Sequence, residues 1–209
     1  MERLKSLLEN YHKARILDVG TGRADFITLI SNIFDDYKEI IGTDISENLI
    51  KYNNDKFKDN PRVSFLEDNI LETKLEKNSF DIIILSNTLH HLLDIEKTIL
   101  SMAELLNNEG IIIINEMIAD NLNSHQKSHK LLHHFAAKVD RERNITHFET
   151  FSKDEIIAIL KGFSFLKIKE YWQLNFENNV ENNHEMFQNL LNRLLILVES
   201  SKNYNSFLQ

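Results

Sequence analysis

The sequence predicts an α/β fold, a three-layer α/β/α sandwich around a doubly wound and mostly parallel sheet. Two observations predict it. Short apolar runs alternate with helical patterns over residues 10–118, and such alternation is typical of parallel strands joined by right-handed crossovers. The run Ile111–Asn115 is almost wholly β-branched, as expected for a central strand covered on both faces. With 209 residues, the chain is long enough for one such domain.

Apolar spacing places the individual elements along the chain. Strands are predicted at 15–19, 39–44, 63–68, 80–87, 111–115 and 163–176, and helices at 4–11, 26–34, 46–60, 95–106, 121–139 and 152–162. Ser46 and Ser152 stand where they would cap two of these helices. A C-terminal helix is predicted from apolar residues that share one helical face: Phe187, Leu190, Leu191, Leu194 and Val198.

Composition and charge exclude several classes of site and partner. The chain has no cysteine, so disulfides, thiolate metal sites and a cysteine nucleophile are excluded. Its net charge of −8 argues against a nucleic-acid groove, which normally carries a basic patch. Residues 1–9 have the pattern of a charged amphipathic helix rather than a signal peptide, and the longest apolar runs are too short to span a bilayer. A cytoplasmic protein without nucleic-acid or membrane partners is expected.

A glycine turn with an acid before it follows the first predicted strand. Gly20 and Gly22 allow a tight turn and a close approach of the backbone to a ligand, and Asp18 precedes them. The next two strands end in Asp44 and Asp68. In doubly wound sheets, ligands bind beyond the carboxyl ends of the strands, where the strand order reverses. These residues therefore predict a ligand site at that edge of the sheet.

Two classes of ligand fit such a turn, a dinucleotide and an adenosyl sulfonium. The dinucleotide fingerprint needs a third glycine three residues after the second, and Asp25 stands there instead. Carboxylates of Asp18 and Asp25 on both sides of the turn are unfavourable beside a pyrophosphate. The same carboxylates favour a cofactor that carries an amino cation and a sulfonium. The charge pattern therefore favours the sulfonium.

Four segments follow one another along the first four predicted strands: Asp18–Ala24, Asp44, Asp68–Asn69 and Phe80–Leu92. In this order they resemble the motifs of class I S-adenosylmethionine-dependent methyltransferases. The matching family features are the acidic glycine turn, the ribose-binding acid, the adenine-contacting pair and the fourth-strand motif of small-molecule enzymes of the methyltransferase-11/25 type. The resemblance covers about residues 10–175. It implies a Rossmann-like fold and S-adenosyl-L-methionine as the cofactor.

The resemblance also implies a cofactor site made of these residues: Asp18, Gly20, Thr21, Gly22, Asp44, Ile45, Asp68, Asn69 and Asn87. By the family pattern, Asp18 orders the turn and lies near the amino group of the cofactor. Asp44 accepts both ribose hydroxyls, Ile45 packs on the adenine, and Asp68 binds the adenine amino group. Asn87 lies under the methionine part.

Three histidines are the candidate catalytic residues. Methyl transfer is an in-line displacement in which positioning does most of the work, and an acceptor that loses a proton also needs a base nearby. His90 and His91 follow the fourth strand and are expected at the floor of the acceptor side. A structural role, in which they bind backbone and shape the pocket, is the stronger alternative. His147, beside Thr146 and Glu149, is a candidate acceptor contact.

A row of histidines lies in the predicted helix 121–139. His125, His129 and His133 are spaced four apart, so they share one helix face and could ligate a metal. That face also carries Leu132 and Ala136, which favours a partly buried packing or substrate-lining row. We therefore expect no metal site. The sequence leaves open whether this row binds substrate or metal.

The chain departs from the family pattern in two places. Ala24 replaces the third glycine, a change expected to cost little. The family closes its sheet with an antiparallel hairpin, and the sequence shows a sixth strand but no seventh before Gln209. Either the chain is truncated or the last strand is replaced. One domain is expected, with a cofactor core at 10–118, a helical lid and substrate region at 119–162, and a sixth strand with the C-terminal helix at 163–209.

Methyl transfer to a small-molecule acceptor is the expected function. The run Asn87–His90 lacks the Pro-Pro-aromatic pattern that many amino-group methylators of macromolecules carry. A protein or RNA methyltransferase and a non-catalytic S-adenosylmethionine-binding partner are the alternatives. The sequence distinguishes neither a quinone, an amine, a phenol nor a carboxylate as the acceptor. It leaves open the oligomeric state, including a homodimer through the C-terminal helix.

Overall fold

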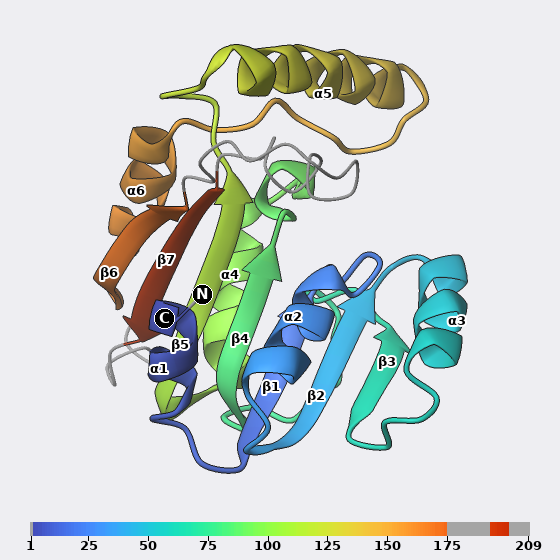
Figure 1. The fold of residues 1–209 in the computed structure, drawn as a ribbon, viewed down its shortest axis with the longest axis vertical. Coiled ribbons are helices and arrows are strands. Elements are labelled where there is room, and N and C mark those ends of the chain that lie inside the picture. Colours follow the sequence, from blue (N-terminus) through green and yellow to red (C-terminus); the bar gives the residue numbers. More distant parts are fainter. Residues whose placement is uncertain (1, 175–192, 201–209) are drawn as a thin grey trace.

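A computed structural model describes residues 2–174 and 193–200 of the protein (Figure 1). A seven-stranded sheet has the order β3-β2-β1-β4-β5-β7-β6. Its strands are β1 (Ala14–Val19), β2 (Tyr37–Asp44), β3 (Val63–Glu67), β4 (Phe80–Ser86), β5 (Leu106–Met117), β6 (Leu166–Leu174) and β7 (Arg193–Ser200). The helices are α1 (Glu2–Leu8), α2 (Asp25–Ile33), α3 (Glu47–Lys56), the short 3-10 helix η1 (Leu89–His91), α4 (Ile95–Leu105), α5 (Ser124–Glu142) and α6 (Lys153–Lys161).

Strand β1 pairs in parallel with β2 on one side and with β4 on the other. From β1 the chain first moves outward through β2 and β3, and then crosses back to β4 and β5. This reversal of strand order marks the carboxyl ends of β1 and β4 as the position where doubly wound sheets bind ligands. The first six predicted strands are confirmed, with shifted boundaries.

Helices cover both faces of the sheet, as the alternation along the chain predicts. Successive side chains of a strand point to opposite faces. Accordingly, Ile82 and Ile84 of β4 belong to the apolar cluster with α1, α2 and α3, whereas Ile83 and Leu85 belong to the cluster with α4 and α6. All four side chains are fully buried. The fold is therefore the expected α/β/α sandwich.

The predicted C-terminal helix is wrong within Arg193–Ser200, where the chain forms β7. This strand inserts between β5 and β6 and runs antiparallel to both, with Ile196 opposite Ile114 of β5. Ile196 and Val198 are fully buried, two residues apart as a strand requires. Leu194 and Val198 also satisfy a helical spacing, which is why periodicity alone favours a helix there. The seventh strand of the family pattern is therefore present.

One further hypothesis depended on the C-terminal helix. The sequence left open a homodimer through this helix, but Arg193–Ser200 pairs within the sheet as a strand. Residues 187, 190 and 191 of the predicted helix lie outside the described residues. Within the part of the chain that the structure describes, no helix has the length and apolar character needed to cross a membrane.

Helix α5 lies across the end of the sheet at which β4 and β5 finish, with the loop 143–152 running back beneath it (Figure 1). A capping box begins it, in which the Asn123 side chain accepts from the Gln126 amide and the Gln126 side chain accepts from the Asn123 amide. The expected apolar contacts of this helix are partly wrong, because Leu132 is 70% exposed and Ala136 is also exposed. Gln126 and Ala137 are the buried side chains instead.

Candidate functional site

The turn after β1 needs glycine at its first position for packing. Gly20 and Gly22 have φ angles of 67° and 54°, in the left-handed region that favours glycine. A β-carbon at Gly20 would lie 2.4 Å from the methyl carbon of Thr88, whose hydroxyl donates to the Gly20 carbonyl. A β-carbon at Gly22 would meet nothing within 4 Å. The backbone at Gly22 is therefore open to a close approach.

The third position of the glycine motif is strained. Ala24 also adopts the left-handed conformation, with φ of 57°, and its side chain is fully buried. A β-carbon in this region costs roughly 1–2 kcal/mol. The expectation that alanine costs little here is therefore wrong for the backbone. Spacing alone did not indicate this, because the sequence does not reveal the sign of φ.

Asp18 is buried under the glycine turn, with 1% of its surface exposed. Its Oδ2 accepts a hydrogen bond of 2.7 Å from the Thr21 hydroxyl, and the Thr21 amide donates to the Thr43 carbonyl. Burial raises the pKa of Asp18 to about 7; the Thr21 hydrogen bond opposes the rise, and the negative charge of Asp44 adds to it. Asp18 therefore holds Thr21 of the turn, and a cation beside it would favour its ionised form.

Asp44, at the end of β2, links the glycine turn to the start of α3. Its Oδ2 accepts from the Gly22 amide and its Oδ1 from the Ser46 amide, each at 2.9 Å. Ser46 occupies the cap position of α3, but its own side chain makes no capping hydrogen bond, which corrects the predicted cap. Ile45 is 77% exposed and offers an apolar surface beside the carboxylate.

Asp68 and Asn87 stand at the carboxyl ends of β3 and β4. The Asp68 amide donates to the Asp44 carbonyl, which brings the two acids to neighbouring positions. Asn87 has a φ of 51°, and its amide donates to the Asn115 carbonyl of β5. Asn69 is exposed, and its side chain accepts from the Leu71 amide at 3.1 Å. The sheet thus brings the predicted cofactor residues to one edge.

Five buried side-chain oxygens of the described residues have no hydrogen-bond partner, and three of them belong to predicted cofactor residues: Oδ1 of Asp18, Oδ2 of Asp68 and Oδ1 of Asn87. Carboxylate and amide oxygens only accept hydrogen bonds, and a buried acceptor without a donor is costly. S-adenosylmethionine carries donors in its ammonium, ribose hydroxyl and adenine amino groups. The residues present therefore fit this cofactor, whereas a pyrophosphate would bring further acceptors.

Two residues that support the turn were not predicted. Asn53 of α3 is fully buried, and its side-chain amide donates to the Gly22 carbonyl at 2.8 Å. Lys56, one turn later, donates to the Arg23 carbonyl and lies 3.6 Å from Asp25. Asp25 is therefore an exposed, paired carboxylate that contributes less to the charge of the site than expected. Asn53 and Lys56 are three residues apart and therefore share one face of α3, which is the sequence signal that could have indicated their role.

His90 lies at the other side of the site, in η1 just after β4. It is 2% exposed, and its Nδ1 lies 2.9 Å from Oε1 of Glu116, which is fully buried at the end of β5. Glu116 also accepts from the amides of Leu89 and Met117. Glu116 was missed because the predicted strand ended one residue earlier. It fixes His90 in place and leaves Nε2 of that ring free to accept.

The three candidate catalytic histidines come together, and α5 adds a fourth. The ring centroids of His91 and His147 are 4.2 Å apart, and those of His90 and His91 are 4.4 Å apart. Nδ1 of His147 lies 2.7 Å from Oδ2 of Asp140, and its Nε2 lies 3.3 Å from Nε2 of His133. The signal for His133 was its place in the histidine row, but its partners could not be read from spacing.

Two of these rings are held neutral by their surroundings. The pKa of His91 is lowered to about 4, mainly by partial desolvation of its ring and also by the charges of His90 and His147, although the residue as a whole is exposed. Burial lowers the pKa of His133 to about 3, with the neighbouring histidines adding to the effect. Nδ1 of His91 lies 3.2 Å from the Thr146 carbonyl, which can only accept. Nε2 of the neutral His91 ring therefore carries a lone pair.

Comparison with known proteins agrees with this geometry. A family model described as "Methyltransferase domain" matches residues 11–190. The chain belongs to this family. It is an S-adenosylmethionine-dependent methyltransferase domain, and its antiparallel β7 completes the seven-stranded sheet.

Similar proteins carry related names. The ubiquinone/menaquinone biosynthesis C-methyltransferase UbiE of Vibrio campbellii is 30% identical over 105 residues, covering 49% of this chain and 40% of that protein. The demethylmenaquinone methyltransferase of Staphylococcus carnosus is 23% identical, covering 76% of this chain and 71% of that one. The crystal structure of an S-adenosylmethionine-dependent methyltransferase from Aquifex aeolicus has a TM-score of 0.65 at 14% identity, covering 94% and 88% of the two chains. The match to UbiE thus spans well under half of that protein's length.

Proposed function

We propose that the protein transfers a methyl group from S-adenosylmethionine to a small-molecule acceptor. The supporting observation is the histidine cluster at the carboxyl ends of β4 and β5, in which His90 and His147 are buried and His91 is exposed. His90 and His147 are 2% and 7% exposed there, and the Phe148 amide donates to the His90 carbonyl. Helix α5 and the loop after it lie over this end of the sheet (Figure 1). Such a cover suits a compact acceptor better than a macromolecular surface.

On the cofactor side, the chain contributes acceptors and one apolar surface. S-adenosylmethionine supplies a methyl group on positively charged sulfur when it is bound. Asp44 would accept the ribose hydroxyls and Asp68 the adenine amino group, with Ile45 against the adenine. Asp18 would lie near the ammonium, and Asn87 near the methionine part. The unpartnered oxygens of Asp18, Asp68 and Asn87 support these roles.

On the acceptor side, the histidines hold the acceptor in position and do not act as bases. A ring whose pKa is about 4, as in His91, is a weak base at neutral pH. Its free Nε2 can accept a hydrogen bond from an acceptor hydroxyl or amine and so hold the acceptor atom in line. His90 is fixed by Glu116 and shapes the floor, which was the structural alternative for this residue. Positioning of this kind supplies much of the rate in displacement reactions.

Release of S-adenosylhomocysteine tests the proposal. The purified chain is incubated with S-adenosylmethionine and either a metabolite fraction below about 1 kDa, a protein fraction or an RNA fraction. The names of the relatives make demethylmenaquinone the first single compound to assay. We expect release with a small-molecule fraction and none with the Asp44→Ala variant. Release only with protein or RNA would contradict the proposal, and binding without release from any fraction would favour the non-catalytic partner.

A further inference from the structure

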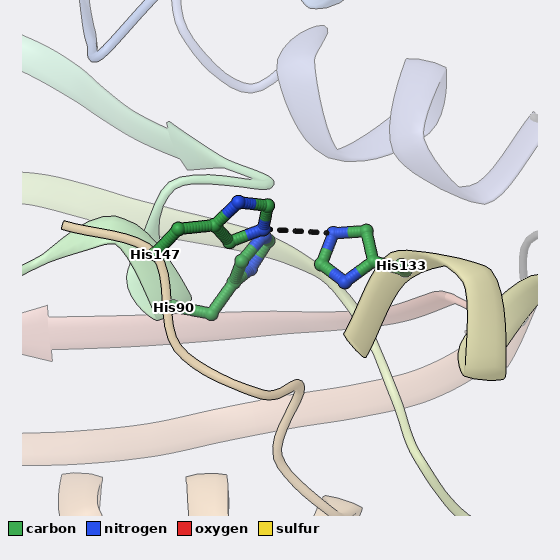
Figure 2. A group of neighbouring side chains, drawn as sticks. All are labelled: His90, His133 and His147. Atoms are coloured by element: carbon green, nitrogen blue, oxygen red, sulfur yellow. Dashed lines mark hydrogen bonds between the residues drawn. The ribbon is translucent and has the colours of Figure 1, made fainter. Parts of the chain in front are cut away.

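We propose that His90, His133 and His147 bind a divalent metal ion that prefers imidazole ligands, with zinc as the type case. One ring nitrogen from each residue lies within 4.8 Å of the other two. Figure 2 shows the His133 ring of α5 directed at the His147 ring of the following loop, with His90 beside His147. The ligand set differs from the row of residues 125, 129 and 133, because the His129 ring centroid lies 6.4 Å from that of His133.

The spacing of two nitrogens matches that of a zinc site. Nε2 of His133 and Nε2 of His147 are 3.3 Å apart. Two imidazole nitrogens bound tetrahedrally to one zinc ion, each about 2.0–2.1 Å from it, lie about 3.3–3.4 Å from each other. The rings therefore stand near the separation that a shared ion imposes. A direct hydrogen bond between the rings is the competing explanation and is an outcome of the test below.

Two of the three ligands already have the carboxylate partner that metal-bound histidines normally have. Nδ1 of His90 lies 2.9 Å from Glu116, and Nδ1 of His147 lies 2.7 Å from Asp140. Such a pair fixes the tautomer and leaves the lone pair of Nε2 for the metal. The two carboxylates also place negative charge around a dication. Nδ1 of His133 has no hydrogen-bond partner among the described residues.

The site would connect separate parts of the fold. Its ligands come from η1, α5 and the loop 143–152, and α5 has only Gln126 and Ala137 buried among its described side chains. A shared metal ion would therefore tie α5 to the sheet. Three imidazoles leave a fourth position open, as in catalytic zinc sites. An oxygen of the acceptor could occupy that position, an extension that rests on the proposed function.

Zinc titration of the tag-free chain tests the site. After dialysis against zinc chloride and then buffer, we expect one zinc ion per chain by elemental analysis. In calorimetric titrations, His133→Ala should weaken zinc binding at least about 100-fold, because loss of a carboxylate partner alone costs 10–100-fold. Asp140→Asn should weaken it roughly 10-fold. The matched control is His129→Ala, which removes a histidine one turn away on the same helix and should leave the affinity unchanged.

Two results would overturn the metal site. One is substoichiometric zinc in the wild-type chain; the other is equal zinc affinity in His133→Ala and His129→Ala, which would leave the 3.3 Å contact as a hydrogen bond between rings. Binding of S-adenosylmethionine to each variant is measured separately. It shows that the variant is folded, and it distinguishes failure of the metal site from failure of the proposed function.

Discussion

The two sides of the site are built differently. The cofactor side consists of oxygen acceptors at the ends of parallel strands, and three of them are buried without a donor. The histidine side consists of imidazoles from a short helix, a long helix and a loop, and two of these rings are held by carboxylates. The sheet register, with support from Asn53 and Lys56 of α3, fixes the first side, whereas the second depends on where α5 lies. Substitutions should therefore affect the two sides independently.

The largest effect is expected from Asp44→Ala. Each hydrogen bond to a charged group contributes about 1.5–3 kcal/mol, so loss of two ribose contacts should weaken S-adenosylmethionine binding by 100-fold or more. Calorimetric titration measures this. Asp25→Ala is the control, because Asp25 is exposed and pairs with Lys56 outside the turn. Unchanged affinity in Asp44→Ala would exclude its ribose role.

Glu116→Ala should cause the largest loss of stability on the histidine side. Glu116 is fully buried and accepts from His90 and from two backbone amides. Removing one partner of a buried pair costs about 3–5 kcal/mol. Asp140→Ala, which removes the partly exposed partner of His147, should destabilise the fold much less, because solvent screens this pair. Urea denaturation compares the two variants. Equal losses of unfolding free energy would contradict the claim that Glu116 stabilises the histidine side more than Asp140 does.

Asp18 should make stability fall as pH rises. Its pKa is raised from 3.8 to about 7 in the folded chain, so between these values the folded state binds more protons than the unfolded state. Its stabilising contribution is therefore present below about pH 4 and is lost as pH rises to about 7. Between pH 5 and 7 the wild type should lose roughly 2–3 kcal/mol relative to Asp18→Asn. If the unfolding free energies of the wild type and Asp18→Asn changed with pH in parallel, the raised pKa of Asp18 would be contradicted.

The two glycines of the turn should give unequal effects. Gly20→Ala places a β-carbon against Thr88 and should cost about 2–4 kcal/mol of stability, from strain and overpacking together. Gly22→Ala meets no atom within 4 Å and should cost about 1 kcal/mol. Denaturant unfolding of both variants measures the difference. Equal costs would show that packing on Thr88 is not what requires Gly20.

Much of the cofactor side could be predicted, for a physical reason. Strand and helix alternation forces the carboxyl ends of parallel strands to one edge, so Asp18, Asp44 and Asp68 had to lie together. The left-handed backbone of Ala24 could not be predicted, because sequence does not report φ. β7 was mistaken for a helix because the same leucine and valine spacing fits both periods.

The histidine side was predictable only as a set of residue types. His90 and His91 are neighbours in sequence, but their contacts with His147 and His133 depend on the packing of α5 and its loop. Predicting the role of Glu116 required the true end of β5, which lies beyond the predicted end at Asn115. Long-range contacts of this kind depend on the tertiary structure and leave no periodic pattern in the sequence.

The most direct test of the account is a calorimetric comparison of S-adenosylmethionine, S-adenosylhomocysteine and NAD on the wild-type chain. The unpartnered acceptors of Asp18, Asp68 and Asn87 predict binding of both sulfur cofactors at one site per chain. Because the pyrophosphate of NAD would place negative charge beside the carboxylates of Asp18 and Asp44, we expect no binding of NAD at the same concentrations. Binding of NAD without binding of S-adenosylmethionine would contradict the assignment of the site.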